Sequence, residues 1–428
     1  MRIDTQTCAD HEADLLDDHR ADLDALASAL GRRGIDTEQV VEQVRAFSVA
    51  APSWAVGTGS TRFGRFPGPG EPRDLHEKVD DVAALNALTG ANRTISLHVP
   101  WDRPTDAAAL REYADTAGLG FDAMNSNTFQ DDPSTTRGGE ISYKFGSMCA
   151  SSVAVRDAAV EHNLDVIAIG EQLGSTALTV WLGDGTNHPG QADHRRQFER
   201  VADCLRQVHD GLPDGWSMFT EHKPYEPAFY SSVNADWGSS LLLAQAAGPR
   251  ASCLVDLGHH LPGANIEQVV SRLAMVDRLG GFHFNDSKYG DDDLTVGSVN
   301  PYQLFLVLVE LVSIGGGSLP SLAYMIDESH NLKDPVEDLI QATDEIQVCL
   351  ARALLVDLGE LASAQDDDDP AAAAEVLQAA HRTDVRPLVA EARRRNGAAL
   401  APLRTYRRIG YRAAVAAERG SGHGATGL

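Results

Sequence analysis

The fold is decided by four apolar runs in the second half of the chain: SMFTEHKP at residues 217–224, ASCLVDLGHH at 251–260, LGGFHFNDSKYGDDD at 279–293 and LAYMIDESHN at 322–331. Each run has the composition of a strand and is followed by a polar turn and then a helical pattern. A parallel βα barrel places the C-terminal ends of its strands on one rim. The side chains at the ends of the runs are therefore expected to converge on one point: Glu221, Asp256, His283 and Asp327.

Three carboxylates and one imidazole at one point would repel strongly without a cation. Oxygen-rich ligation with one nitrogen suits a hard or borderline divalent ion such as Mn²⁺, Mg²⁺ or Co²⁺. A second group of ligand-type residues lies beside the first: His259, Asp291 and Asp293. With a carboxylate of the first group as a bridge, these residues could hold a second cation. Two metals close together can clamp adjacent oxygens of a substrate.

The rest of the chain favours the same fold. Eight strand-like runs are expected near residues 47–56, 94–100, 120–125, 164–170, 216–222, 251–258, 280–286 and 322–327. Helical patterns lie between them. In RRQFERVADCLRQVH, for example, apolar residues at 198, 201, 205 and 208 follow the spacing of an amphipathic helix. Strict strand–helix alternation predicts an α/β fold, a (β/α)8 TIM barrel.

The two ends differ from this central part. Residues 1–46 are expected to form an N-terminal helical segment and residues 47–345 the catalytic barrel. Residues 346–428 are expected to form a C-terminal helical extension with a disordered tail. We expect the extension to pack against a neighbouring subunit.

Composition indicates where the protein is located and which kinds of partner it can bind. The net charge of −26 argues against nucleic acid and anionic membranes as partners. Five scattered cysteines without a CxxC motif predict free, buried thiols in a cytoplasmic protein. The acidic N-terminus does not resemble a signal peptide, and the most apolar run, LFLVLVELVSIGG, is too short to span a bilayer and contains Glu310.

Taken together, these segments resemble the L-rhamnose isomerase family of the xylose-isomerase-like barrels, in its broad-specificity bacterial branch. The matching stretches extend over most of the chain: RFGRFPGPGEP, SLHVPWD, WLGDGTNHPGQ, TEHKPYEPAFYSS, VDLGHH, GGFHFNDSKYGDDDL, GSVNPYQLF and YMIDESHNLKDP. The resemblance implies a homotetramer, Mn²⁺ dependence and conversion of L-rhamnose to L-rhamnulose, with D-allose and other sugars as further substrates.

The resemblance also implies a role for each site residue. Glu221, Asp256, His283 and Asp327 match the structural-metal ligands, with Glu221 as the bridge, and His259, Asp291 and Asp293 match the catalytic-metal ligands. Lys223 would face the O1 and O2 end of the sugar, and Ser329 would lie close to the pocket. Together with Asp327, these two residues are the catalytic candidates. His98 and Trp181 would line the pocket, and Phe66 would reach into a neighbour's site. Spacing assigns the ligand role to His259 and not to His260.

Other interpretations remain open. A strand-end Asp taken alone commonly caps the following helix, and Asp291-Asp292-Asp293 could be a solvated turn. Within the fold, the alternative function is a ketose 3-epimerase. In other classes, the alternatives are a metal-dependent phosphodiesterase of the endonuclease IV type and a non-catalytic sugar-binding protein.

Overall fold

A closed parallel barrel forms the centre of the molecule. The computed structural model describes residues 2–57, 68–225, 230–329 and 332–420. One parallel sheet has the strand order β12-β11-β10-β8-β6-β5-β3, and a second has the order β1-β2-β4. β2 leads directly into β3, and β4 into β5, so each pair forms one interrupted strand. Ala50 closes the ring by accepting a hydrogen bond from Ile326 N at 3.0 Å and donating one to Tyr324 O at 2.8 Å.

The strands are short and mostly buried. Their bounds are β1 Ala51–Pro52, β2 Thr94–Ser96, β3 His98–Val99, β4 Gly120–Phe121, β5 Met124–Ser126, β6 Ala177–Trp181, β8 Ser217–Glu221, β10 Ala251–Asp256, β11 Leu279–Phe284 and β12 Ala323–Ile326. A small antiparallel pair stands apart from the barrel: β7 Gly185–Thr186 and β9 Ser231–Ser232. The expected (β/α)8 barrel is therefore confirmed.

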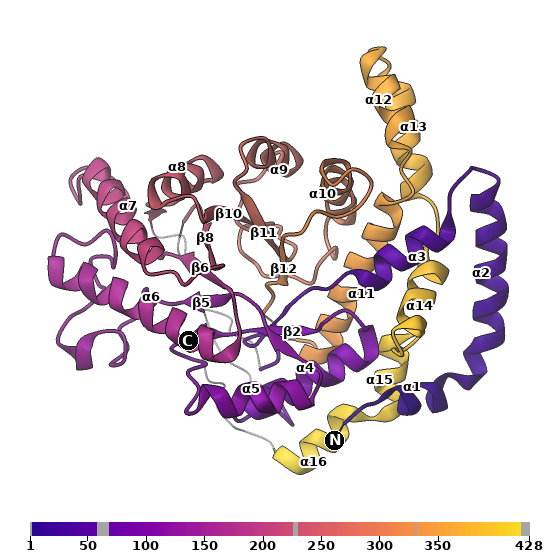
Figure 1. The fold of residues 1–428 in the computed structure, drawn as a ribbon, viewed down its shortest axis with the longest axis horizontal. Helices are drawn as coiled ribbons and strands as arrows, with labels where there is room; N and C mark the ends of the chain where they lie inside the picture. Colours follow the sequence, from indigo (N-terminus) through magenta and orange to yellow (C-terminus); the bar gives the residue numbers. More distant parts are fainter. Residues whose placement is uncertain (1, 58–67, 226–229, 330–331, 421–428) are drawn as a thin grey trace.

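Helices surround the barrel (Figure 1). Those that follow its strands are α4 Leu75–Thr89, α5 Ala107–Thr116, α6 Val153–Leu173, α7 His194–Asp210, α8 Trp237–Ala247, α9 Ile266–Met275, α10 Pro301–Ile314 and α11 Pro335–Ala353. As predicted, the buried face of α7 contains Val201, Leu205 and Val208, with Phe198 partly buried against the core. No helix in the described part of the chain is both long and apolar enough to cross a membrane.

The predicted terminal helices are present. Before the barrel come α1 Thr5–Glu12, η1 Ala13–Leu15, α2 Leu16–Gly31 and α3 Thr37–Ala46; a further short turn, η2, spans Arg137–Gly139. After it come α12 Leu358–Asp366, α13 Pro370–His381, α14 Arg386–Arg395, α15 Pro402–Ile409 and α16 Tyr411–Arg419. α12 and α13 project from the body, whereas α14 packs on α2 and α3 (Figure 1). The expected boundary at residue 345 lies inside α11. The expected disordered tail, GSGHGATGL at 420–428, lies outside the described residues except for Gly420.

One predicted strand is wrong. Residues 164–170 belong to α6, and the strand at this position of the barrel is β6, Ala177–Trp181. The run LDVIAIG is apolar because this helix is buried on a broad face, which includes Val166, Ile167 and Ile169. A short apolar run does not by itself distinguish a buried helix from a strand. Gly170 fits this packing, since a Cβ there would lie 2.6 Å from Trp216 and 2.7 Å from Met124.

The length of the first strand differs from the prediction, whereas the state of the cysteines agrees with it. The first strand is much shorter than residues 47–56, because the chain turns at Ser53–Ala55 after Pro52. The five cysteines are free and buried, as expected.

Aspartates are the usual N-caps of these helices. The side chains that accept hydrogen bonds from first-turn amides include Asp4, Asp36, Asp74, Asp106, Asp193, Asp236, Asp334, Asp357 and Asp369. The helix after β10 is capped by Asn265, and the helix after β12 is capped by Asp334. The strand-end residues Asp256 and Asp327 are therefore not the caps of these helices.

Candidate active site

Four strand-end side chains meet at the C-terminal rim of the barrel. Glu221 ends β8, Asp256 ends β10, His283 lies in β11, and Asp327 follows β12 directly. Nδ1 of His283 lies 3.1 Å from a carboxylate oxygen of Glu221, 3.6 Å from one of Asp256 and 3.4 Å from one of Asp327. One ligand-type atom from each of the four lies within 4.8 Å of the others. The predicted convergence is therefore a feature of the structure.

The donor atoms of this cluster fit a divalent cation. Asp256 is fully buried; its Oδ1 accepts hydrogen bonds from Gly258 N and Asn285 Nδ2, at 2.8 and 2.9 Å. Its Oδ2 accepts none from the described residues and faces His283. A buried carboxylate oxygen is costly to leave without a compensating charge. Three carboxylates and an imidazole that share one point supply the ligands that hard or borderline cations prefer.

The charges in the cluster are strongly coupled. Burial raises the pKa of Asp256. Burial acts on Glu221 in the same direction, but the imidazoles of His283 and His259 outweigh it and bring the pKa of Glu221 well below its usual range. Burial would lower the pKa of His283 and His259, yet the surrounding carboxylates raise it well above the ordinary value. Perturbations of this size are typical of functional sites.

The second predicted group lies next to the first. Nδ1 of His259 is 3.2 Å from Oε1 of Glu221, and its Nε2 is 2.8 Å from Oδ1 of Asp291. The other oxygen of Asp291 lies 2.5 Å from Nζ of Lys223. Asp293 lines the same pocket and accepts a hydrogen bond from Ser329 Oγ at 3.1 Å. His259 thus links the two groups through Glu221, while Ser329 reaches the pocket through Asp293.

The acidic turn has a structural residue at its centre. Asp292 accepts hydrogen bonds from the backbone amides of Lys288, Tyr289 and Gly290. On either side of it, Asp291 and Asp293 adopt left-handed φ values of 52° and 47°. Such values are uncommon for residues other than glycine and often mark functional sites. Asp292 therefore fixes the turn, and its two neighbours face the pocket.

His259 and its neighbour His260 have different surroundings. His259 lines the pocket, whereas the ring of His260 packs edge-on against His222, with 4.8 Å between centroids. Burial lowers the pKa of His260 to about 4. Of the two neighbouring histidines, His259 is therefore the one that lines the pocket.

An aromatic wall encloses a cavity of about 340 Å³ above the cluster. Trp181 is the last residue of β6 and pairs in register with Glu221. Nζ of Lys223 lies 4.7 Å from the centre of the Trp181 ring. The ring of Phe129 packs edge-on against the same Trp181 ring, with 4.4 Å between the two centroids. A cavity of this size suits a small molecule.

His98 lies in the same wall, between Trp54 and Trp101, with ring centroids 5.6 and 4.3 Å away. Burial lowers the pKa of His98 to about 4, so the imidazole is neutral near pH 7. A neutral imidazole can both donate and accept a hydrogen bond. Phe66 lies outside the described residues.

Sequence reasoning missed part of the wall. Trp54 donates from Nε1 to Oδ1 of Asp327 at 2.9 Å and so orients one member of the cluster. The other missed lining residues are Trp101, Asn125, Ser126, Phe129, Gln130, Thr179 and Tyr230. The signal available for Trp54 was its position near the C-terminal end of the strand expected at residues 47–56, since the C-terminal ends of barrel strands carry the site.

Comparison with known proteins supplies the family. No protein-family model matches the chain. A probable sugar isomerase of Rhizobium meliloti is 52% identical over 423 residues, which cover 98% of this chain and 97% of the relative. A probable sugar isomerase of Mesorhizobium japonicum is 53% identical over 412 residues, covering 96% and 95%. The chain belongs to this sugar isomerase family.

Solved structures with a similar fold are more distant in sequence than these family members. An L-ribulose 3-epimerase is 15% identical, with a TM-score of 0.52, and the match covers 72% of this chain and 95% of the epimerase. A D-allulose 3-epimerase of Methylomonas sp. is 14% identical, with a TM-score of 0.52, and the match covers 71% and 98%. At this identity the likeness concerns the fold, which is the TIM barrel described above.

Proposed function

We propose that the chain is a metal-dependent aldose–ketose isomerase that acts on a small neutral sugar, with L-rhamnose as the leading substrate. The observation that carries the proposal is the cluster of Glu221, Asp256, His283 and Asp327 at the floor of an aromatic-walled pocket. The names of the curated relatives support an isomerase. L-Rhamnose itself rests on the resemblance of the sequence motifs, and D-allose, L-mannose and L-lyxose are the next candidates.

Two divalent cations are proposed, with Mn²⁺ first. Glu221, Asp256, His283 and Asp327 would hold one, and His259, Asp291 and Asp293 would hold the other, with Glu221 shared. A pair of divalent cations supplies two fixed positive charges that hold adjacent sugar oxygens and stabilise negative charge on them. Trp54 would keep the carboxylate of Asp327 in the orientation that its ligand role needs.

The pocket side chains would bind and orient the sugar. Lys223, which is buried and forms an ion pair with Asp291, would donate a hydrogen bond to the O1 end. His98 is neutral near pH 7 and would donate to or accept from a hydroxyl group. Trp181 and the other rings would cover the apolar C–H faces of the sugar and exclude water.

A neutral substrate fits the charges better than a sugar phosphate. Among the described residues that line the pocket, Lys223 is the one lysine or arginine, and it already faces Asp291. Phosphate groups are usually held by several cationic side chains or by amides at a helix N-terminus. The net charge of −26 argues against a nuclease, because DNA binding relies on basic surfaces.

The deciding experiment is a sugar panel with the metal-stripped protein. Ketose formation from L-rhamnose, D-allose, L-mannose and L-lyxose is measured before and after Mn²⁺ is added. The proposal expects Mn²⁺-dependent ketose formation that is lost in Lys223→Met and kept in Lys288→Met, an exposed lysine on the neighbouring loop. Epimerisation of ketoses at C3 alone, cleavage of abasic DNA, or sugar binding without turnover would each replace the proposal.

A homotetramer is part of the proposal. Large apolar side chains are exposed on the loops at the C-terminal end of the barrel: Leu261 at 59%, Tyr289 at 77% and Leu332 at 97%. Exposed apolar patches are typical of interaction surfaces. Light scattering on the purified protein should give a mass near four chains. Phe66→Ala should raise KM without weakening Mn²⁺ binding, and a monomer with unchanged kinetics would contradict this part.

A further inference from the structure

The last helix in the described residues, α16, packs on a loop at the catalytic rim. This loop connects β1 to α4, and its residue Gly70 contacts α16 directly. A Cβ on Gly70 would lie 2.8 Å from Ala416 N and 2.9 Å from Val415 Cγ2. Gly70 N also donates to Gly420 O at 2.9 Å. The backbone at Gly70 is therefore seated on α16 with no room for a side chain.

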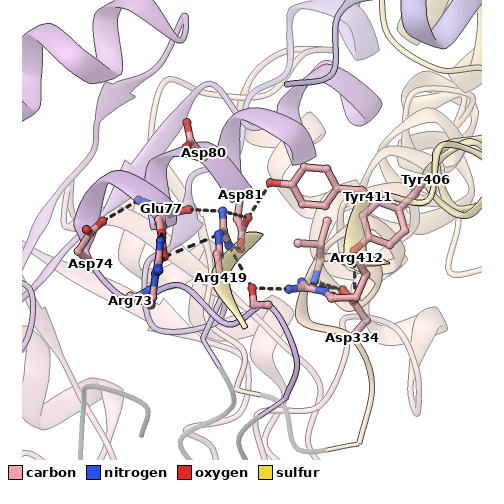
Figure 2. A network of polar contacts seen from close by, with 12 residues as sticks. Arg73, Asp74, Glu77, Asp80, Asp81, Asp334, Tyr406, Tyr411, Arg412 and Arg419 are labelled. Carbon is pink, nitrogen blue, oxygen red and sulfur yellow. Dashed lines mark hydrogen bonds and ion pairs between the residues drawn. The ribbon is translucent and has the colours of Figure 1, made fainter. Parts of the chain in front are cut away.

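Two arginines of α16 bind the same loop. The carbonyl oxygen of Gly70 accepts from Arg412 Nη1 at 2.9 Å and from Arg419 Nη1 at 3.1 Å. Arg419 is buried and also reaches Asp81 of α4, which accepts a hydrogen bond from Tyr411 as well (Figure 2). These contacts fix α16 on the barrel.

Arg412 also binds the loop between β12 and α11. Its Nε donates to Oδ2 of Asp334 at 2.5 Å and its Nη2 to Oδ1 at 3.2 Å (Figure 2). Tyr406 donates to the same carboxylate at 3.0 Å. Asp334 in turn caps α11 and ends the loop that carries Asp327 and Ser329. One guanidinium thus joins two rim loops that are far apart in the sequence.

The same two loops meet again inside the pocket. Trp54, at the start of the β1–α4 loop, donates to Asp327, at the start of the β12–α11 loop. The described parts of the two loops are therefore joined twice, at the cluster by Trp54 and at the periphery by Arg412. A displacement that separates these parts would have to stretch or break both contacts.

We propose that Arg412 is a positioning residue of the active site: by joining Gly70 to Asp334 it holds Trp54 and Asp327 in register at the cluster. The guanidinium suits this task because its planar fork reaches a carboxylate and a carbonyl together. The proposal rests on the proposed function for its catalytic consequence, whereas the loop geometry and the metal affinity are independent of which sugar is converted.

The test compares Arg412→Met with Arg407→Met. Arg407 makes a two-pronged ion pair with Glu337, at 2.7 Å for both contacts, on the first turn of the same helix α11. Arg407 is exposed, however, and its ion pair reaches α11 and not the β1–α4 loop. Two further variants guard against simple misfolding. Arg412→Lys keeps the charge but not the fork, and Asp334→Asn keeps the helix cap but not the charge.

Hydrogen–deuterium exchange, Mn²⁺ titration and steady-state kinetics are measured on all four variants. In Arg412→Met, exchange should rise in residues 50–57 and 323–329, and Mn²⁺ should bind about tenfold more weakly, the lower end of the effect of outer-shell partners. KM should rise in parallel. Arg412→Lys and Asp334→Asn should be intermediate, and Arg407→Met should match the parent protein.

Two results would overturn the inference. One is a change in exchange confined to α16, with parental Mn²⁺ affinity and KM, because the arginine would then only anchor the helix. The other is full parental behaviour of Arg412→Lys. If the parent binds Mn²⁺ but converts no sugar, the proposed function fails, while looser rim loops and weaker Mn²⁺ binding in Arg412→Met still support this inference.

Discussion

Nδ1 of His283 lies 3.1 Å from Oε1 of Glu221, although the strand that carries Asp256 runs between them. The contact is made across the mouth of the barrel, where side chains from non-adjacent strands meet. A cation at this point would tie four strands together. Its effect should therefore be visible in the stability of the fold as well as in turnover.

Removal of metal should abolish activity and lower the melting temperature. Binding to the folded state alone stabilises a protein by about 2.7 kcal/mol when the free ion is at 100 times its Kd. Differential scanning fluorimetry of chelated and Mn²⁺-reloaded protein measures this shift, and the ketose assay measures turnover. Full turnover of the chelated protein in metal-free buffer would contradict the central proposal.

The two ligand groups should differ in what their loss damages. Asp256→Asn should reduce both stability and turnover, since Asp256 is fully buried and also holds Gly258 and Asn285. The expected loss of stability is about 1–3 kcal/mol, the cost of an unsatisfied buried group. Asp291→Asn and His259→Ala should abolish turnover with little effect on folding. Urea unfolding measures the free energy of unfolding of the three variants. An equal loss of stability in all three would mean that the ligands are wrongly grouped.

Stability should fall in mild acid, in part because of His162. Burial lowers the pKa of His162 to about 4, whereas an unfolded histidine has a pKa of about 6.5. Between these values the unfolded state binds more protons, so the contribution of His162 is fully present above pH 6.5 and is lost as the pH falls towards 4. The slope for one such group approaches about 1.4 kcal/mol per pH unit.

His162→Gln removes this group and can still donate to the carbonyl of Val99, which His162 contacts at 3.2 Å. Urea unfolding at pH 7.5, 6.0 and 5.0 should show a smaller loss of stability for the variant than for the parent. Parallel curves would show that His162 is protonated in the folded protein as readily as in the unfolded chain.

Gly170→Ala should destabilise the barrel although it improves helix propensity. The propensity gain is about 0.5–1 kcal/mol, but the new Cβ would lie 2.6 Å from Trp216 and 2.7 Å from Met124. Overpacking of this kind costs about 1–3 kcal/mol. Gly31→Ala is the control, because a Cβ there meets nothing within 4 Å. The melting temperature should fall for the first variant and not for the second.

The sequence was most informative where chemistry and position coincide. Glu221, Asp256, His283 and Asp327 could be selected because each ends an apolar run, and parallel strands bring such ends together. The family motifs added roles that spacing alone does not give. The strand predicted at residues 164–170 was wrong because this part of α6 turns Val166, Ile167 and Ile169 to the core, so the run is as apolar as a buried strand. Trp54 was missed because an indole after a two-residue strand carries no ligand signal, and its partner Asp327 is distant in sequence.

The last prediction concerns the hydrogen that moves during isomerisation. Among the described residues that line the pocket, the carboxylates are Glu221, Asp291, Asp293 and Asp327, and each faces another polar group. The low pKa of Glu221, where His283 and His259 outweigh burial, makes it a weak base. Lys223 is held in an ion pair with Asp291 and is suited to donate, not to abstract. His98 is neutral, but burial lowers its pKa to about 4, so it is also a weak base. A proton at C2 therefore lacks a strong acceptor among these residues, whereas general base catalysis needs one within hydrogen-bond reach.

We accordingly expect the hydrogen to pass from C2 to C1 within the sugar, without release to water. Aldose labelled with deuterium at C2 is converted in ordinary water, and the ketose is examined by NMR or mass spectrometry. Label retained at C1 supports direct transfer, with the charge at O1 and O2 stabilised electrostatically. The matched control runs unlabelled aldose in heavy water, where the ketose should gain no deuterium on carbon. Extensive exchange in either experiment would show proton transfer and would require a base that the described pocket residues do not supply.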